Sequence, residues 1–316
     1  MAKRITGILK LFAMPVAIFL IFSFVAKGFG VHSIPTILSQ SVTPVMIGFG
    51  LSFLMNAELM DLSMGARTVL AAILGGTMAQ SMGIAGLILG CLIGGLAGSV
   101  VMALIYRYSR IPMMVVSLGI VMIYEVVGAK ITGSSGYLRI DSDVYKVASY
   151  PLNLVILLAG GVLCYILYYR TQIGCHITAV GNDEKMCKNV GVNPDRVKFI
   201  AIILTGIFCA IAAVLTICYS GAITASTEMG TISMAIKSII CVILGRQMRK
   251  VCDCMPLLIG IGGLCVTIIF NGFIAMGFSD SLQDIVLGLF LIIVLGYSAN
   301  SKVFAEIFKK RGLAKA

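Results

Sequence analysis

The stretch Tyr169–Lys198, YRTQIGCHITAVGNDEKMCKNVGVNPDRVK, is the longest polar interval in an otherwise apolar chain of 316 residues. Asn182 or Asp183 can cap a short helix, and Gly191 stands where that helix would end. We therefore predict a helix over Asp183–Val190, of about two turns, which is too short to be stable alone in water. A short capped helix between two membrane-length segments is typical of a docking element. The alternative is a plain solvated loop.

The rest of the chain is strongly apolar. Hydrophobic residues make up 59% of the positions and charged residues only 12%, whereas a soluble globular chain carries roughly 25% charged residues. The apolar runs are continuous and about 20 residues long, as in membrane-spanning helices, and they do not alternate as barrel strands do. The predicted fold class is therefore all-α, a polytopic membrane helical bundle that forms a single transmembrane domain over residues 1–316.

Apolar runs separated by polar turns predict about ten transmembrane helices. Their expected bounds are Leu11–Ala26, Ile37–Met55, Gly65–Ser81, Ile84–Tyr106, Met113–Thr132, Pro151–Tyr169, Val197–Tyr219, Ile232–Gly245, Pro256–Met276 and Leu282–Tyr297. The first run has a basic start but no small-residue cleavage site, so we expect it to remain as an uncleaved helix.

The net charge of +11 is spread unevenly over the turns. With the N-terminus inside, 18 of the 24 Lys and Arg residues fall in cytoplasmic segments, and four lie outside, at Lys27, Lys130, Arg139 and Lys146. Such a bias fixes the orientation of a membrane protein. We expect both termini to be cytoplasmic, and we assign the basic charge to membrane topology, with no nucleic-acid partner.

The motifs of an enzyme or a nucleotide-binding protein are missing from the sequence. It contains neither GxxxxGK[ST] nor HExxH, and its two histidines, His32 and His176, are far apart and predicted on opposite sides of the membrane. Cys252 and Cys254 form a CxC without a second pair or a nearby histidine. We therefore predict no catalytic residues, no metal site and no cofactor bound by this chain.

A polar break interrupts the apolar pattern after the second predicted span. It reads NAELMDLSMGAR, over Asn56–Arg67, and carries Glu58, Asp61 and Arg67. Within a bilayer, irregular polar backbone is tolerated only where it lines a cavity or is buried in protein, and charges there normally face the bundle interior. This break is a functional candidate.

Four glycines recur at every fourth residue of the fourth predicted span, at Gly86, Gly90, Gly94 and Gly98. Small residues at that spacing let two membrane helices approach closely. We expect a packing role for this stripe and not a ligand site.

An internal repeat relates two parts of the chain. A shift of 170 residues aligns Glu58–Met78 with Glu228–Met248 without a gap, with seven identities in 21 positions, and places Arg67 opposite Lys237. In the predicted topology the two segments run in opposite directions, as in the inverted repeats of many transporters, whose interrupted helices point to the substrate pathway. The repeat halves are expected at about 37–132 and 197–297, joined through a cytoplasmic coupling loop at 170–196.

The repeat assigns candidate residues to a translocation pathway. These are Glu58, Asp61, Arg67, Glu228, Lys237 and Asn271. Asn271 belongs to this set because it is a polar residue within the ninth predicted span. Each break has a carboxylate nine residues before a cation, Glu58 before Arg67 and Glu228 before Lys237. The alternative is that these charges satisfy one another and the broken backbone.

Three passages together resemble the membrane subunits of ribose-type ABC importers, across nearly the whole chain. NAELMDLSMGA is similar to the family's IDLSVG segment. TQIGCHITAVGNDEKMCKNVGVNPDRVKFIAIILTGIFCAIAAVL is similar to its cytoplasmic loop and following span. YSGAITASTEMGTISMAIKSIICVILG is similar to its next external loop and short span.

The resemblance implies a permease subunit for a sugar or related small solute in the bacterial plasma (inner) membrane. It implies a dimer with a second copy or a paralogue, surrounded by membrane lipid. It also implies two cytoplasmic ATP-binding cassette ATPase subunits, which use the ATP, and an extracytoplasmic substrate-binding protein. By the resemblance, the coupling helix that contacts the ATPase involves Gly181, Asn182, Asp183, Glu184, Met186, Val190 and Gly191.

The sequence departs from the family pattern in two places. Met186 and Cys187 stand where the family usually has two small residues, and GRQMRKVCDC, Gly245–Cys254, replaces a glycine-rich turn. A diverged partner in a heterodimer fits these departures as well as a homodimer does. Nucleosides and branched-chain amino acids remain alternative substrates. An ion-coupled secondary transporter that uses Glu58, Asp61 or Glu125 is the alternative mechanism.

Overall fold

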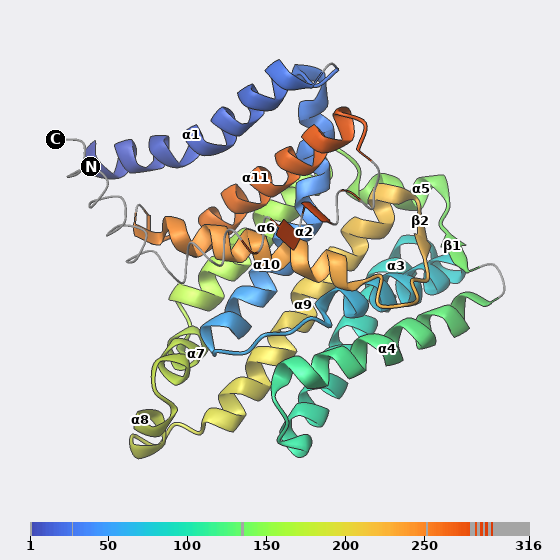
Figure 1. The fold of residues 1–316 in the computed structure, drawn as a ribbon. Helices are drawn as coiled ribbons and strands as arrows, with labels where there is room; N and C mark the ends of the chain where they lie inside the picture. Colours follow the sequence, from blue (N-terminus) through green and yellow to red (C-terminus); the bar gives the residue numbers. More distant parts are fainter. Residues whose placement is uncertain are drawn as a thin grey trace.

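The computed structural model describes residues 2–26, 28–133, 136–250 and 252–278, with isolated positions from 282 to 292. This part of the chain is a helical bundle with one small two-stranded ladder (Figure 1). The helices are α1 Ala2–Val25, α2 Ile34–Asn56, α3 Met64–Ser109, α4 Met113–Thr132, α5 Ser142–Tyr145, α6 Leu152–Tyr169, α7 Gln172–Asn182, α8 Glu184–Asn189, α9 Pro194–Ser220, α10 Ile232–Gln247 and α11 Met255–Ala275. The strands are β1 Tyr137–Arg139 and β2 Ala222–Thr224.

Six helices of the described residues are long and apolar enough to cross a membrane, and α1 contributes a shorter apolar run over Leu11–Val25. The prediction of an all-α polytopic membrane protein is confirmed at this level. The expected spans coincide closely with α2, α4, α6, α9, α10 and α11. The tenth expected span, Leu282–Tyr297, and the external Lys27 lie outside the described residues.

Helix α3 contains two expected spans in one element. Its two arms meet at Gly83, whose φ of 60° and ψ of −137° are not helical, and they fold back against each other. A Cβ atom on Gly90 would lie 2.7 Å from Cα of Gly75, and one on Gly94 would lie 2.8 Å from Cα of Ala71. Because only glycine permits this approach, the packing role predicted for the glycine stripe is confirmed.

The centre of the bundle is built by α2 and α9, which lie against each other. Helix α9 also packs against α3, where a Cβ on Gly206 would come within 2.8 Å of the Gly95 carbonyl oxygen. Helix α2 also packs against α10 and α11. Each central helix thus contacts elements from the other half of the sequence.

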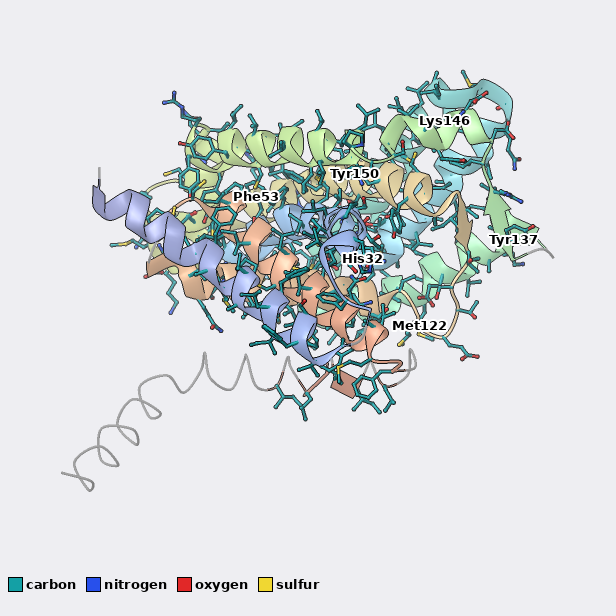
Figure 2. The ribbon with its side chains drawn as sticks, turned by 90° about the horizontal axis from the view of Figure 1, so that it is seen from above. His32, Phe53, Met122, Tyr137, Lys146 and Tyr150 are labelled. Carbon is teal, nitrogen blue, oxygen red and sulfur yellow. The ribbon has the colours of Figure 1, made fainter. Side chains whose placement is uncertain are left out.

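Two structured ends lie on opposite sides of the bundle (Figure 1). One carries α7 and α8. The other carries α5 and the ladder, in which β1 pairs antiparallel with β2, with Leu138 opposite Ile223. Tyr137 and Lys146 both lie at this second end (Figure 2). The sequence does not predict this ladder, because a three-residue strand has no distinct pattern of its own.

Candidate functional site

The first break in the helical pattern is the segment 57–63 between α2 and α3. It is held by Asp61, whose Oδ1 accepts hydrogen bonds from both N and Oγ of Ser63 at 2.7 Å. Ser63 is the residue directly before α3. A carboxylate at this position satisfies backbone donors at the start of the helix and interacts favourably with the helix dipole.

Arg67 lies in the first turn of α3 and connects this break to two other helices. Its Nη2 donates to Asp61, while its Nη1 donates to Ser99 Oγ at 2.7 Å and to Thr205 Oγ1 at 2.9 Å. The side chains of Asp61 and Arg67 are both 0% exposed. The prediction paired Glu58 with Arg67 by spacing, whereas the structure pairs Arg67 with Asp61.

The second break lies between β2 and α10 and is held by Glu125 of α4. Its Oε1 accepts from Thr231 N at 2.9 Å and from Thr231 Oγ1 at 2.7 Å, and its Oε2 accepts from Met229 N at 2.8 Å. Thr231 directly precedes α10. The carboxylate of Glu125 within a predicted span was the one signal of this contact, but its partner lies more than 100 residues away and had no signal of its own.

The two breaks meet in space. A Cβ on Gly65, at the start of α3, would lie 2.1 Å from the Thr231 carbonyl oxygen, at the start of α10. Glu58 and Glu228, which the repeat aligns, both have positive φ, 57° and 62°. Only glycine adopts this conformation without strain, so both positions are backbone irregularities of the same kind.

From this meeting point the two helices lead to opposite ends of the molecule. The first arm of α3 runs toward the ladder, where Gly76 packs against Leu138 of β1. Helix α10 runs toward the α7 end, where Arg246 Nη2 donates to Asn56 Oδ1. The aligned segments therefore run in opposite directions.

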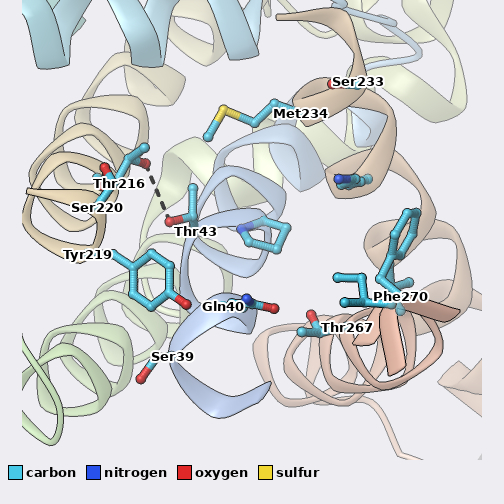
Figure 3. A pocket seen from close by; sticks show the side chains of 14 residues that line it. Ser39, Gln40, Thr43, Thr216, Tyr219, Ser220, Ser233, Met234, Thr267 and Phe270 are labelled. Atoms are coloured by element: carbon cyan, nitrogen blue, oxygen red, sulfur yellow. Dashed lines mark hydrogen bonds between the residues drawn. The ribbon is translucent and has the colours of Figure 1, made fainter. Parts of the chain in front are cut away.

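A cavity of about 430 Å³ lies between α2, α9, α10 and α11 (Figure 3). Polar side chains from these helices face into it: Ser39, Gln40, Thr43, Thr216, Tyr219, Ser220, Ser233, Lys237 and Thr267. Thr43 Oγ1 and Thr216 Oγ1 are 3.4 Å apart across the α2–α9 contact. Hydroxyl, amide and ammonium groups in one cavity provide hydrogen bonds for a small polar solute.

The six pathway candidates take different places relative to this cavity. Lys237 lines it, with Nζ 4.6 Å from the centre of the Phe270 ring. Asn271 Nδ2 donates to Oε1 of the lining residue Gln40 at 2.6 Å. Glu58 and Glu228 are exposed at the breaks, and Asp61 and Arg67 are buried in the network described above. These four are not part of the lining of this cavity.

Sequence reasoning did not identify the polar residues of α2 and α9 that line the cavity. Gln40 and Thr43 are three residues apart on α2, and Thr216, Tyr219 and Ser220 have helical spacing on α9. A polar face at this spacing within an apolar span was the available signal.

The predicted short helix is present as α8. Asp183 caps it, because Oδ1 accepts from Lys185 N at 2.8 Å and from Met186 N at 3.0 Å. Val190 follows the last helical residue, and Gly191 has a φ of +83°. Met186 is 67% and Val190 74% exposed, so α8 presents apolar side chains to its surroundings.

The residues around α8 differ from the expected loop in one respect. Asn182 is the last residue of an additional helix, α7, and does not cap α8. Glu184 forms an ion pair with Lys198 of α9, which ties α8 to the next long helix.

Helix α7 connects α8 to the first break. A Cβ on Gly181 would lie 1.7 Å from the carbonyl oxygen of Asn56, the last residue of α2. The Asn56 side chain donates to Tyr168 and accepts from Arg246. Packed atoms therefore connect α7, which directly precedes α8, to the ends of α2 and α10.

Comparison with known proteins places these features in a family. A sequence model described as "Branched-chain amino acid transport system / permease component" matches residues 33–295. The autoinducer 2 import system permease protein LsrD of Photorhabdus luminescens is 29% identical over 199 residues, which cover 58% of this chain and 58% of the relative. The galactose/methyl galactoside import permease protein MglC of Escherichia coli (strain K12) is 26% identical over 209 residues, 58% of this chain and 62% of the relative. The chain thus spans less than two thirds of the length of these relatives.

Proposed function

The chain belongs to the branched-chain amino acid transport system / permease component family, and from that premise we propose that it is the transmembrane permease subunit of an ABC importer. Its cargo is a sugar or a related small solute, like those named for the autoinducer 2 and galactose import relatives. The observation that carries the proposal is the cavity between α2, α9, α10 and α11, into which polar side chains of all four helices face, beside the point where the two helical breaks meet.

We further propose a ten-helix bundle with an inverted repeat, in one transmembrane domain. The opposite directions of α3 and α10, their contact at Gly65 and Thr231, and the positive φ at Glu58 and Glu228 support this arrangement. In an inverted repeat the substrate site lies near the pseudo-two-fold axis, and the inward and outward openings are two packings of the same helices.

The pathway candidates have two roles in this proposal. Lys237 contacts the solute, and Asn271 orients Gln40 toward it. Asp61 and Arg67 hold the first break together, while Glu58 and Glu228 lie where the backbone changes direction. A second cavity at the ladder end shares Tyr219 and Ser220 with the first, which gives the solute a route from that side.

The partners follow from the family. ATP-binding cassette ATPases supply the energy, and their closure moves α8, whose Met186 and Val190 seat in an apolar groove of the ATPase. An extracytoplasmic binding protein delivers the solute at the ladder end, and a second permease copy or a paralogue completes the pathway. The protein resides in the bacterial inner membrane with both termini cytoplasmic, and it uses no cofactor or metal of its own.

An ion-coupled secondary transporter is the second candidate, because Asp61 and Glu125 are buried carboxylates within the bundle. Their geometry favours the first candidate. Asp61 is paired with Arg67, and both Glu125 oxygens accept backbone hydrogen bonds, so both groups are engaged in holding the breaks.

Energy dependence of uptake tests the proposed function. Right-side-out membrane vesicles containing the full importer are loaded with ATP and given radiolabelled galactose, ribose, a nucleoside or leucine. Accumulation of at least one solute is expected to require trapped ATP and to persist when an ionophore dissipates the ion gradients. Accumulation without ATP that an ionophore abolishes would assign the chain to the second candidate.

Substitution of Asn271 by leucine is expected to weaken uptake by raising the half-saturating solute concentration about fivefold. This loss corresponds to about 1 kcal/mol for one hydrogen-bonded amide that is no longer oriented. The readout is the concentration dependence of uptake in the same vesicles, with Gly119→Ala in α4 as the control because its Cβ meets nothing within 4 Å. An unchanged half-saturating concentration would remove Gln40 and Asn271 from the solute site.

A further inference from the structure

A separate cavity of about 740 Å³ lies at the α8 end of the molecule, where α3 ends, α4 begins and α9 begins. Its lining includes Tyr106, Arg107 and Arg110 from the α3–α4 turn, together with Asp195 and Phe199 of α9. The transport proposal does not use this cavity. Its lining includes two arginines, one aspartate and two tyrosines, at the point where the apolar part of α3 ends.

Both arginines are placed by the fold. The Arg107 guanidinium lies 5.7 Å from the centre of the Phe199 ring, which fixes the orientation of its planar group. Arg110 follows the last residue of α3 with a φ of 53°, a conformation that glycine adopts there without strain. Within the described residues neither guanidinium lies in an ion pair.

Four exposed apolar residues, close in sequence to those that line the cavity, form what we call the apolar wall. Ile105 of α3, Ile111 of the turn, and Met114 and Val115 of α4 are all exposed large apolar side chains. In a membrane protein such a face contacts acyl chains, and tyrosines at the end of a span lie at the level of the headgroups. The cavity and the wall together have the amphipathic form of a phospholipid.

We propose that this cavity binds the phosphate headgroup of an anionic phospholipid in the leaflet on the α8 side, with its acyl chains along the apolar wall. Arg107 and Arg110 donate charge-assisted hydrogen bonds to the phosphate oxygens, since guanidinium groups match phosphate geometry. Basic pockets between helices on the cytoplasmic side bind such headgroups for the same physical reasons. The inference requires that the chain spans a membrane but not that it transports a solute.

An acidic surface of an ATPase subunit is the competing occupant for two arginines at this end. The apolar wall favours the lipid, because a soluble acidic partner gains nothing from exposed Met114 and Val115 within the bilayer. The wall also distinguishes a lipid from a soluble phosphate compound, which would contact the arginines alone.

Lipid retention by the purified chain tests the proposal. The full-length protein is incubated in detergent with equal amounts of phosphatidylglycerol and phosphatidylcholine, and the bound lipid is counted by native mass spectrometry. The wild type is expected to retain one phosphatidylglycerol in preference to phosphatidylcholine. The double variant Arg107→Gln and Arg110→Gln should lose about 25-fold of that preference, since each cation contributes roughly fivefold to attraction of anionic lipid.

Three controls make the result specific to this cavity. The control variant Arg170→Gln with Arg249→Gln also removes two positive charges from this end of the molecule, at two exposed arginines outside the cavity. It should keep the preference for phosphatidylglycerol. The variant Arg107→Lys with Arg110→Lys keeps both positive charges and should retain most of the preference for phosphatidylglycerol. Millimolar glycerol 3-phosphate should not displace the lipid.

The proposal is overturned if the Gln double variant retains phosphatidylglycerol as the wild type does. It is also overturned if glycerol 3-phosphate competes fully, or if the Gln variant weakens ATPase binding without a change in lipid retention. Far-ultraviolet circular dichroism of each variant checks that the fold is intact. None of these measurements depends on transport, so failure here and failure of the transport proposal are separate results.

Discussion

Asp61→Ala is expected to destabilise the protein by about 3–5 kcal/mol, because it leaves a fully buried Arg67 guanidinium without its counter-charge. Asp61 also accepts the two Ser63 hydrogen bonds at the start of α3, which the substitution removes. The measurement is thermal unfolding followed with a dye that fluoresces on reaction with thiols. Buried cysteines such as Cys91 and Cys209 become accessible only when the bundle opens.

A double variant separates the charge from the packing. Asp61→Asn with Arg67→Met removes both charges and keeps an acceptor for Ser63, so it should recover most of the stability lost in Asp61→Ala. Glu58→Gln serves as the matched control, since Glu58 is exposed in the same break. If Asp61→Ala unfolds at the wild-type temperature, the buried pair does not hold the break.

The long elements of the fold were predictable because their apolar runs are continuous. The bounds expected for α4, Met113–Thr132, are those observed, and the Asp183 cap of α8 was readable from one polar residue before a short helix. The glycine stripe predicted a close contact between two helices, which the two arms of α3 make. Each of these features is predicted by a pattern of residues that lie close together in the chain.

Other features depend on partners far apart in the chain, which no local sequence pattern identifies. Glu125 meets Thr231 across more than 100 residues, and Gln40 meets Asn271 across more than 200. Spacing paired Glu58 with Arg67, but the backbone turns at Glu58 and places Asp61 beside Arg67 instead. The polar faces of α2 and α9 are readable in the sequence, but no local pattern predicts that they form a cavity with α10 and α11.

Gly181→Val is expected to reduce ATP-dependent uptake by about tenfold or more, the size of a typical coupling free energy between two sites. The added Cβ would lie 1.7 Å from the Asn56 carbonyl oxygen, so α7 must separate from the end of α2. Asn56 also contacts Arg246 of α10, and the separation therefore disconnects α8 from both helices that flank the breaks. Because α8 itself is unchanged, binding of the ATPase should persist.

The combination of retained ATPase binding and lost uptake distinguishes uncoupling from misfolding. The control is Gly119→Val in α4, where the added Cβ meets nothing within 4 Å and uptake should be unaffected. Thermal unfolding of both variants is measured in parallel. We expect Gly181→Val to lower the unfolding temperature only slightly, because α7 lies at the edge of the bundle and can shift outward. Wild-type uptake by Gly181→Val would show that movement of α8 reaches the breaks by another route, such as the ion pair between Glu184 and Lys198 of α9.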